Sequence, residues 1–227
     1  MNIDLVVFDM AGTTIADNGE IAAAFKTALK HFGYDVPKEA INTVMGYKKT
    51  KAIKMMLNLY GPSASNTEDL IEEIHTVFLN EMIAHYSGLN EIEILPYVEE
   101  IFLFLKSKGI KVALDTGFTK QIAEVIIEKL GWLKNHTIDC MVCSDDVPKG
   151  RPYPFMIEKI MQQVCVTDSQ KVIKVGDTEV DVNEGFNANC LYSIGITTGA
   201  FTRQELSIYN PSFIIDHLSE LEKIICS

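Results

Sequence analysis

Short apolar runs recur along the chain, and longer stretches with a helical period of apolar residues separate most of them. Runs of about four to eight apolar and β-branched residues favour buried strands, and a period near 3.6 favours helices that pack on a sheet. The runs that predict strands are Ile3–Phe8, Lys111–Leu114, Ile138–Cys143, Val172–Val175, Cys190–Ile196 and the weaker Phe213–Ile215. The stretches that predict helices between them are Tyr97–Lys108, Thr119–Leu130, Pro154–Gln163 and Val180–Asn187.

Strands that alternate with helices indicate an α/β fold, here a Rossmann-like parallel sheet with helices on both faces. Residues 16–88 interrupt this alternation, because helical stretches follow one another there without a convincing strand. These stretches are Ile21–Phe32, Lys38–Met45, Thr50–Leu59 and Glu68–His85. We therefore expect an inserted all-helical cap domain at 16–88 and a catalytic α/β core made of residues 1–15 and 89–227.

The charge balance narrows the classes of partner. The formal net charge is −11, whereas non-specific binding of nucleic acid needs a basic surface. No apolar run approaches the ~20 residues that span a membrane, and the first residues lack the basic segment of a secretory signal. The five cysteines are widely spaced and do not suggest a disulfide framework. We expect no nucleic-acid or membrane partner, and a cytoplasmic location.

Candidate reactive side chains follow the first two strands of the expected core. Asp9 comes at the end of a buried run and precedes a Gly-Thr turn, which would hold its carboxylate in a fixed position at the end of the strand. Thr116 and Gly117 follow the second run, where a hydroxyl and the N–H groups of a helix start suit a phosphoryl group. Helix capping is the alternative interpretation of Asp9 and Thr116, because both residue types are common caps.

Further candidates follow the later strands. Lys149 and Arg151 come after the third run, where a cation can neutralise a nucleophile and a phosphate together, although a solvated loop would look the same. Asp177 and Asp181 follow the fourth run and lie four residues apart, on one face of a helix start. Carboxylate oxygens are the ligands that Mg²⁺ prefers, although an acidic first turn is also favoured by the helix dipole. All these residues stand at strand ends, where parallel sheets bind their ligands.

The segment Phe8–Thr14, Phe-Asp-Met-Ala-Gly-Thr-Thr, resembles the first signature of the haloacid-dehalogenase-like hydrolases, Asp-x-Asp-Gly-Thr. The later strand-end motifs follow in the order of that superfamily and span nearly the whole chain. The resemblance implies a Mg²⁺ cofactor and an aspartate nucleophile. By this resemblance Asp9 is the nucleophile and a metal ligand, and Ala11 binds the metal through its backbone carbonyl. Thr116 and Gly117 bind phosphoryl oxygens, and Arg151, in preference to Lys149, neutralises charge. Asp177 binds the metal directly, and Asp181 binds it through water or anchors the other ligands.

The chain departs from that signature at Ala11, where the phosphatases of the superfamily carry their general acid. The same departure is typical of the phosphonatase branch, which breaks P–C bonds. The segment Met45–Lys49 resembles the cap motif Met-Gly-x-x-Lys of that branch, which makes Lys49 the lysine that forms a Schiff base. A basic helix start with solvated lysines is the alternative interpretation. Two positions differ from the branch: Ala52 stands in place of a histidine that assists proton transfer, and Phe118 replaces a tyrosine.

Three functions stay open on this evidence. The first is a Mg²⁺-dependent hydrolase that cleaves the P–C bond of a small phosphonate through Asp9 and a Lys49 Schiff base, which accepts the electrons of the carbanion leaving group. The second is a phosphatase that hydrolyses small phosphate monoesters with the same nucleophile. The third is a binder that has lost its acid, and the retained Asp9, Asp177 and Asp181 speak against it. The expected partner is a small phosphorylated or phosphonate substrate, and the expected assembly, if one forms, is a homodimer through the cap.

Overall fold

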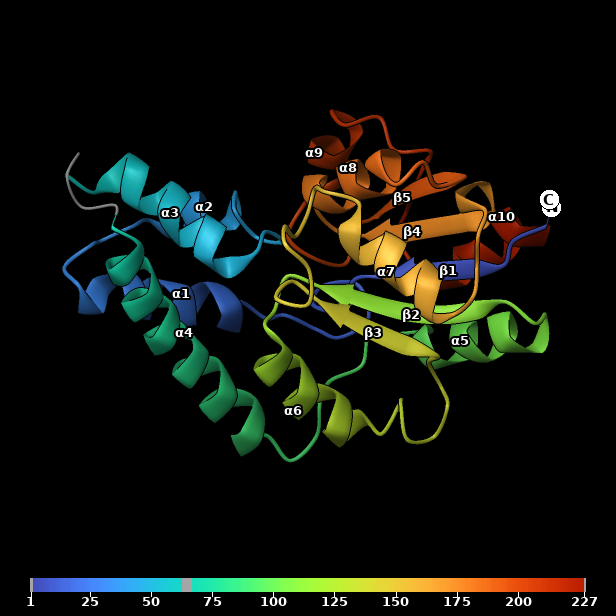
Figure 1. The fold of residues 1–227 in the computed structure, drawn as a ribbon, viewed down its shortest axis with the longest axis horizontal. Coiled ribbons are helices and arrows are strands. Elements are labelled where there is room, and N and C mark those ends of the chain that lie inside the picture. The colour runs from blue at the N-terminus through green and yellow to red at the C-terminus, as the bar shows by residue number, and fades with distance from the viewer. Residues whose placement is uncertain (1, 63–66, 227) are drawn as a thin grey trace.

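Six strands pair in one parallel sheet in the computed structural model, which describes residues 2–62 and 67–226 (Figure 1). The strands are β1 (Leu5–Phe8), β2 (Lys111–Thr116), β3 (Cys140–Cys143), β4 (Val172–Gly176), β5 (Tyr192–Ile196) and β6 (Phe213–Ile215). Their order across the sheet is β3-β2-β1-β4-β5-β6. The predicted α/β fold with a parallel sheet is confirmed, and every expected run carries a strand.

β1 lies in the middle of the sheet, where Phe8 pairs with Leu114 of β2 on one side and Val175 of β4 on the other. The chain order runs outward from β1 in both directions, so the carboxyl end of β1 is a topological switch point, the usual ligand site of such sheets. β2 runs two residues further than expected, because Asp115 and Thr116 also pair with β3. Two polar residues are thereby built into the strand itself.

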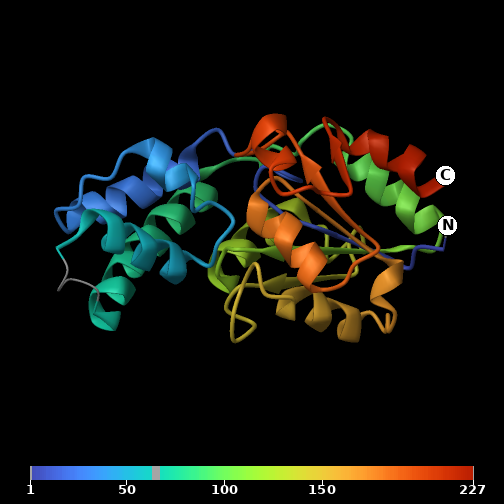
Figure 2. The same ribbon diagram turned by 90° about the horizontal axis from the view of Figure 1, so that it is seen from above.

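Helices cover both faces of the sheet (Figure 2). They are α5 (Val98–Ser107), α6 (Lys120–Leu130), α7 (Phe155–Gln163), α8 (Glu179–Asn187), α9 (Arg203–Ser207) and α10 (Leu221–Cys226), with 3₁₀ turns η1 (Ser169–Lys171) and η2 (Leu218–Glu220). Val6 and Phe8 of β1 belong to the same apolar cluster as α5, α6 and α10, whereas Leu5 and Val7 belong to the cluster of α7. This alternation follows from the two-residue period of a strand. The four helices predicted in this part are confirmed, each within one residue at both ends.

Four further helices lie together beside the carboxyl ends of the strands (Figure 1). They are α1 (Glu20–His31), α2 (Lys38–Asn42), α3 (Lys49–Tyr60) and α4 (Glu68–Gly88). They pack on one another through apolar side chains, as where the rings of Phe25 and Phe78 meet edge to face with centroids 5.7 Å apart. Residues 63–66 of this segment lie outside the described residues, and the division into a cap at 16–88 and a core stays a prediction. Within the described ranges, no helix is long and apolar enough to cross a membrane.

The helix expected at Lys38–Met45 is wrong at its carboxyl end. α2 ends at Asn42, and turns follow it up to α3. Gly46 has a φ of 84°, in the left-handed region that glycine adopts most readily, and a Cβ atom there would lie 2.5 Å from Oγ1 of Thr178. The chain therefore leaves the helix in order to bring the Gly46 backbone against the loop after β4.

The two segments that connect these helices to the sheet pair with each other. The N–H of Ala16 donates to the carbonyl of Glu93 at 2.9 Å, and the N–H of Leu95 donates to the carbonyl of Thr14 at 3.1 Å. Ile15 forms an antiparallel bridge with Ile94 between these hydrogen bonds. The outgoing and returning chains thus form one short two-stranded connection.

Candidate active site

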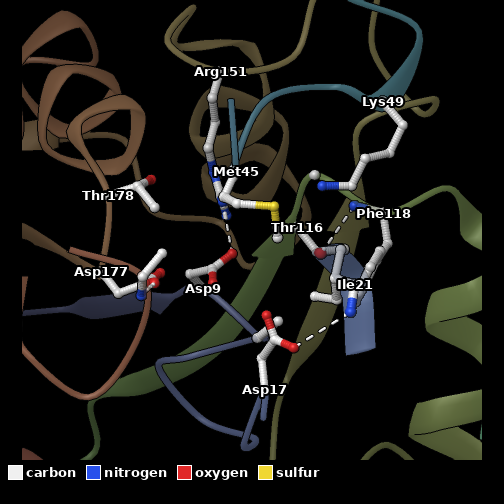
Figure 3. Close-up of a pocket in the computed structure, with 14 residues that line it drawn as sticks. Asp9, Asp17, Ile21, Met45, Lys49, Thr116, Phe118, Arg151, Asp177 and Thr178 are labelled. Atoms are coloured by element: carbon white, nitrogen blue, oxygen red, sulfur yellow. Dashed lines mark hydrogen bonds and ion pairs between the residues drawn. The ribbon is translucent and has the colours of Figure 1, made fainter. Parts of the chain in front are cut away.

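A narrow cavity lies where the carboxyl ends of β1, β2 and β4 meet the segments around α1 and α3 (Figure 3). Fourteen residues line it: Asp9, Ala11, Asp17, Ile21, Met45, Gly46, Lys49, Thr116, Gly117, Phe118, Arg151, Asp177, Thr178 and Ala200. The structure therefore brings together all the site residues expected from the sequence except Asp181. That residue is buried below the cavity and does not line it.

Asp9 follows β1 directly and is 5% exposed. Its N–H donates to the carbonyl of Val175 at 3.0 Å, so the residue continues the alignment of β1 with β4. One carboxylate oxygen lies 2.6 Å from Nη1 of Arg151. Burial raises the pKa of Asp9 to about 6, against the lowering effect of Arg151. A rigid and poorly hydrated carboxylate of this kind is a suitable nucleophile once a cation holds it in the ionised form.

The turn after Asp9 fixes its backbone. The hydroxyl of Thr14 donates to the carbonyls of Asp9 and Met10, both at 3.1 Å. Gly12 has a φ of 84°, and a Cβ atom on it would lie 2.7 Å from Oδ2 of Asp177. The glycine of the sequence motif is therefore required by the close approach of two acidic loops.

Thr116 and Gly117 form the second wall of the cavity. Oγ1 of Thr116 accepts a hydrogen bond from the N–H of Phe118 at 3.1 Å, which turns the chain away from β2. A Cβ atom on Gly117 would lie 2.7 Å from the carbonyl oxygen of Gly46. This contact brings the loop before α3 directly onto the end of β2, and only a residue without a side chain fits there.

Arg151 is the cation of the cavity. It is 1% exposed, and its Nη1 contacts Asp9, while Nε lies 3.1 Å from Oε2 of Glu184. Nη2 contacts the carboxylate of Asp115 and donates to its backbone carbonyl at 2.9 Å. Lys149, the alternative cation in the sequence, is exposed and does not line this cavity. The structure thus places Arg151, and not Lys149, beside the expected nucleophile.

Below the cavity lies a buried ionic cluster that the sequence did not reveal. Nζ of Lys174 contacts Asp115 and lies 3.2 Å from Oδ1 of Asp181 and 3.5 Å from Oε2 of Glu184. All four side chains are fully buried, and Oδ1 of Asp181 also lies 3.0 Å from Arg151. The sequence offered one sign of this cluster, the single lysine inside the apolar run of β4. A charged side chain is buried in a strand only where oppositely charged or polar groups contact it. The cluster holds Arg151 in place from below.

Asp9, the carbonyl of Ala11 and Asp177 are the donors expected for Mg²⁺, and all three residues line the cavity. Burial, and after it the negative charges of Asp9 and Asp181, raise the pKa of Asp177 well above its usual range. Oδ2 of Asp177 accepts one hydrogen bond, from the N–H of Ala200 at 2.6 Å. Two buried carboxylates that repel each other are stabilised by a cation between them, and hard oxygen donors suit Mg²⁺. These residues therefore fit the ion.

A second set of carboxylates also comes close enough to hold a metal ion. Oxygens of Asp9, Asp115 and Asp181 lie within 4.8 Å of one another. Arg151 and Lys174 already contact this set, so an ion there would compete with two fixed cations. The set around Asp177 is the better candidate, and the contacts of Asp181 favour an anchoring role for that residue.

Lys49 is the first residue of α3 and is 4% exposed. Its Nζ lies 5.7 Å from the ring centroid of Phe118, and Figure 3 shows the side chain reaching toward that ring and Thr116. Burial lowers the pKa of Lys49 to about 8, Asp17 and Asp9 oppose this shift, and Arg151 adds to it. The amine is therefore far easier to deprotonate than that of an exposed lysine.

The neighbouring lysines behave differently, which separates Lys49 from an ordinary basic helix start. Lys51 is exposed, with its Nζ 4.5 Å from the ring centroid of Tyr47, and Lys54 pairs with Glu68 at 3.1 Å. Ala52 is 1% exposed and belongs to the apolar core. The position of the missing histidine thus offers no group for proton transfer.

Asp17 is the most notable cavity residue that the sequence reasoning missed. Its Oδ1 accepts hydrogen bonds from the N–H groups of Gly19 at 3.0 Å and Ile21 at 3.4 Å. An Asp before a helix is normally interpreted as a capping residue, so the sequence carried no sign that its carboxylate also faces the cavity. Met45, Thr178 and Ala200 were missed as well, because they contribute mainly shape or backbone groups.

The chain is similar to known proteins over nearly its whole length. The model of one protein family, described as haloacid dehalogenase-like hydrolase, matches residues 6–194. A curated protein named phosphonoacetaldehyde hydrolase from Bacillus mycoides is 30% identical over 267 aligned positions, which cover 99% of this chain and 96% of that protein. A protein of the same name from Bacillus cereus is 28% identical, covering 88% of this chain and 78% of its own.

Solved structures share the fold. A phosphonoacetaldehyde hydrolase-like protein from Oleispira antarctica superposes with a TM-score of 0.86 at 24% identity, covering all of this chain and 92% of its own. A predicted phosphoglycolate phosphatase from Haemophilus somnus gives a TM-score of 0.81 at 20% identity, covering 99% of both chains. At these identities the structures establish the architecture alone.

Proposed function

The chain belongs to the haloacid dehalogenase-like hydrolases, and we propose that it uses Mg²⁺ to cleave the P–C bond of a small phosphonate that carries a carbonyl group. One observation carries the proposal: a buried lysine, Lys49, lines the same cavity as the Asp9 carboxylate. A phosphate ester has no carbonyl group with which this amine could condense, whereas a carbonyl beside the scissile bond allows it to form an imine. The 30% identity to a phosphonoacetaldehyde hydrolase supports the same choice.

Asp9 is the proposed nucleophile. Its carboxylate attacks phosphorus and takes the phosphoryl group, which water later removes as inorganic phosphate. Arg151 lies 2.6 Å from that carboxylate and neutralises the charge that gathers there. Thr116 and the N–H groups after β2 would hold the phosphoryl oxygens. Mg²⁺ bound by Asp9, Asp177 and the Ala11 carbonyl would supply further positive charge for the phosphoryl group.

Lys49 activates the leaving group in this proposal. Its neutral amine condenses with the carbonyl of the substrate and forms a protonated imine, which accepts the electron pair of the P–C bond as that bond breaks. With a pKa of about 8, roughly one Lys49 in ten is neutral at pH 7, against about one in ~2,500 for a free lysine. The burial of Lys49 therefore supplies about two orders of magnitude more of the reactive form.

A phosphatase with the same nucleophile is the second candidate. It is favoured by Ala52, because imine formation in the phosphonatase branch uses a histidine at that position and the side chain here is packed in the core. A phosphate ester would need an acid for its alkoxide, and Ala11 cannot supply one. The expected cytoplasmic location and the homodimer through the cap stay predictions under either function.

Trapping with borohydride separates the two candidates. Borohydride reduces an imine to a stable amine, so incubation with phosphonoacetaldehyde should yield a covalent adduct that peptide mass spectrometry locates on Lys49. Lys49→Arg keeps the charge but cannot form the imine, and should lose both the adduct and phosphate release. Lys54→Arg on the same helix is the matched control and should behave as wild type. Ready hydrolysis of p-nitrophenyl phosphate, without an adduct or phosphate from any carbonyl phosphonate, would replace this proposal by the phosphatase.

A further inference from the structure

The chemistry proposed for Lys49 requires proton transfer at three points. The ammonium group must lose a proton before it attacks, the carbinolamine hydroxyl must gain one before it leaves as water, and the carbon released from phosphorus must gain one. A positioned acid–base group accelerates such transfers by about 10²–10⁴-fold. Ala52 cannot serve, because its methyl side chain carries no proton donor or acceptor.

Within the described residues, five titratable side chains line the cavity: Asp9, Asp17, Lys49, Arg151 and Asp177. Asp9 is the nucleophile, Asp177 is a candidate metal ligand and Lys49 is the amine itself. Arg151 stays charged throughout the accessible pH range. Asp17 is the group that the proposed mechanism has not yet used.

Asp17 stands between the cavity and the outside of the protein. It also lines a second, more open cavity of about 780 Å³, which shares Met45, Asp177 and Ala200 with the inner one. Figure 3 shows the carboxylate of Asp17 and the amine of Lys49 facing the same space from different segments. Of the charges that act on Lys49, that of Asp17 has the largest effect. A proton that leaves Lys49 therefore has an acceptor that also borders the open cavity.

Asp17 has a carboxyl partner. Burial raises the pKa of Asp17, and the carboxyl group of Glu20, the first residue of α1, raises it further. Like charges side by side repel each other, which favours the protonated form of Asp17. Glu20 in turn lines a third cavity, of about 550 Å³, together with Tyr86 and His85. The pair thus extends from the Lys49 cavity to a separate surface opening.

We propose that the Asp17–Glu20 carboxyl pair carries the protons of the Lys49 reaction between the inner cavity and solvent. This inference rests on the proposed phosphonatase function. It assigns to the segment between β1 and α1 the task for which the phosphonatase branch uses a histidine on the lysine helix. No other titratable side chain lines both the inner and the open cavity within the described residues, apart from the candidate metal ligand Asp177.

The steps balance as follows. The Asp17 carboxylate takes a proton from the Lys49 ammonium, the amine nitrogen bonds to the carbonyl carbon, and the carbonyl electrons move to oxygen. One proton moves from the nitrogen to the carbonyl oxygen, which gives a neutral carbinolamine. Its hydroxyl takes a second proton from the pair and leaves as water, which produces the protonated imine. When Asp9 takes the phosphoryl group, the P–C electrons move toward the imine nitrogen and give an enamine. The enamine carbon then takes a proton from the pair, and water hydrolyses the imine to free Lys49 and the carbonyl product.

Asp17→Asn tests the relay, because the amide keeps an oxygen for the N–H groups of Gly19 and Ile21 but cannot exchange protons. We expect borohydride trapping on Lys49 in a single turnover with phosphonoacetaldehyde to slow by about 10²-fold or more. Phosphate release should slow equally, while binding of inorganic phosphate with Mg²⁺ stays within about twofold. Asp35→Asn, an exposed Asp in the same group of helices, is the matched control and should react as wild type.

A rescue experiment excludes a merely structural role. Asp17→Ser keeps a hydroxyl oxygen for the start of α1 and leaves space for a small carboxylic acid. Formate should restore a substantial part of the trapping rate in Asp17→Ser and have no effect on wild type or on Asp35→Asn. Glu20→Gln should slow trapping several-fold, since Asp17 then lacks its proton-sharing partner.

The outcomes separate this inference from the function on which it rests. If wild type forms no borohydride-trapped adduct with a carbonyl phosphonate, the phosphonatase proposal fails and the relay fails with it. If wild type forms the adduct and Asp17→Asn forms it at the same rate, the relay alone is wrong. An Asp17→Ser variant that stays slow in formate while folded normally would likewise overturn it.

Discussion

The pH profile of imine formation is the most direct test of the environment of Lys49. With a pKa of about 8, the neutral fraction of the amine is about one hundredth at pH 6, one tenth at pH 7 and one half at pH 8. Because burial lowers the pKa, the reactive neutral form increases as the pH rises. The rate of adduct formation should therefore grow about tenfold per pH unit below 7.5 and level off above about 8.5.

The charged groups around Lys49 determine the direction in which bound Mg²⁺ should shift the inflection of this pH profile. Asp17, Asp9 and Asp177 raise its pKa, and Arg151 lowers it. Saturating Mg²⁺ would neutralise Asp9 and Asp177, so the inflection should lie at or below 8 in the loaded enzyme. The assay is borohydride quenching of single turnovers between pH 5.5 and 9.5, followed by mass spectrometry. A rate that still rises tenfold per pH unit up to pH 9.5, as expected for the pKa of ~10.4 of a free lysine, would refute the reasoning, because it would mean that Lys49 is hydrated.

The same pKa shift predicts an effect on stability. Lys49 is harder to protonate in the folded protein than in the unfolded chain. At pH 7 the lysine is mostly charged in both states, so its burial lowers the free energy of unfolding by up to about 3 kcal/mol. Lys49→Met should therefore raise the free energy of unfolding at pH 6–7. The gain should fade as the pH rises from about 8 to about 10.4, where the folded lysine is already neutral. Urea titrations at both ends of that range measure it, and a larger gain at pH 10 than at pH 6 would contradict the assigned environment.

Three further substitutions test the rest of the site. Asp9→Asn should abolish phosphate release from every substrate, because an amide cannot become an acyl phosphate, and turnover above the level of a mock preparation would remove Asp9 as the nucleophile. Asp177→Ala should lower Mg²⁺-dependent activity by more than about 10²-fold and leave the circular dichroism spectrum unchanged; full activity of wild type in a chelator would argue against the metal. Lys174→Met should destabilise the fold by about 3–5 kcal/mol, since it leaves carboxylates without a counter-charge, and a variant as stable as wild type in urea would show that Arg151 alone compensates them.

The candidate site could be proposed from the sequence where strand topology alone brings residues together. Asp9, Thr116 and Asp177 each end a strand of one parallel sheet, so their convergence follows from the register of β1 with β2 and β4. The fold class followed from the same alternation of apolar runs and helical stretches. Arg151 could be chosen over Lys149 from the spacing of its motif, and its position beside Asp9 agrees with that choice.

Long-range contacts set the limit of that reasoning. The carboxylates that pair with Lys174 come from β2 and α8, and no local sequence pattern predicts that these side chains contact one another. α2 ends early because Gly46 packs against Thr178, a contact between residues more than a hundred positions apart. The burial of Lys49 depends on the loop before α3 resting on Gly117, so its sequence neighbours, which are basic and mostly exposed, gave the opposite impression.

The paired connection between the sheet and helices α1–α4 has a consequence for selectivity. Because Ala16 and Leu95 are hydrogen-bonded to the opposite connecting segment, a tilt of the helices away from the sheet would have to move both connections together. Any such tilt would carry Lys49 away from the Phe118 ring into water, where a lysine is almost wholly protonated and condenses only slowly with carbonyl compounds. Small aldehydes that meet the open molecule would then find an inert ammonium group. The amine would become a good nucleophile only when the helices and the sheet enclose a ligand together. The paired connection would therefore protect Lys49 from reaction with other compounds.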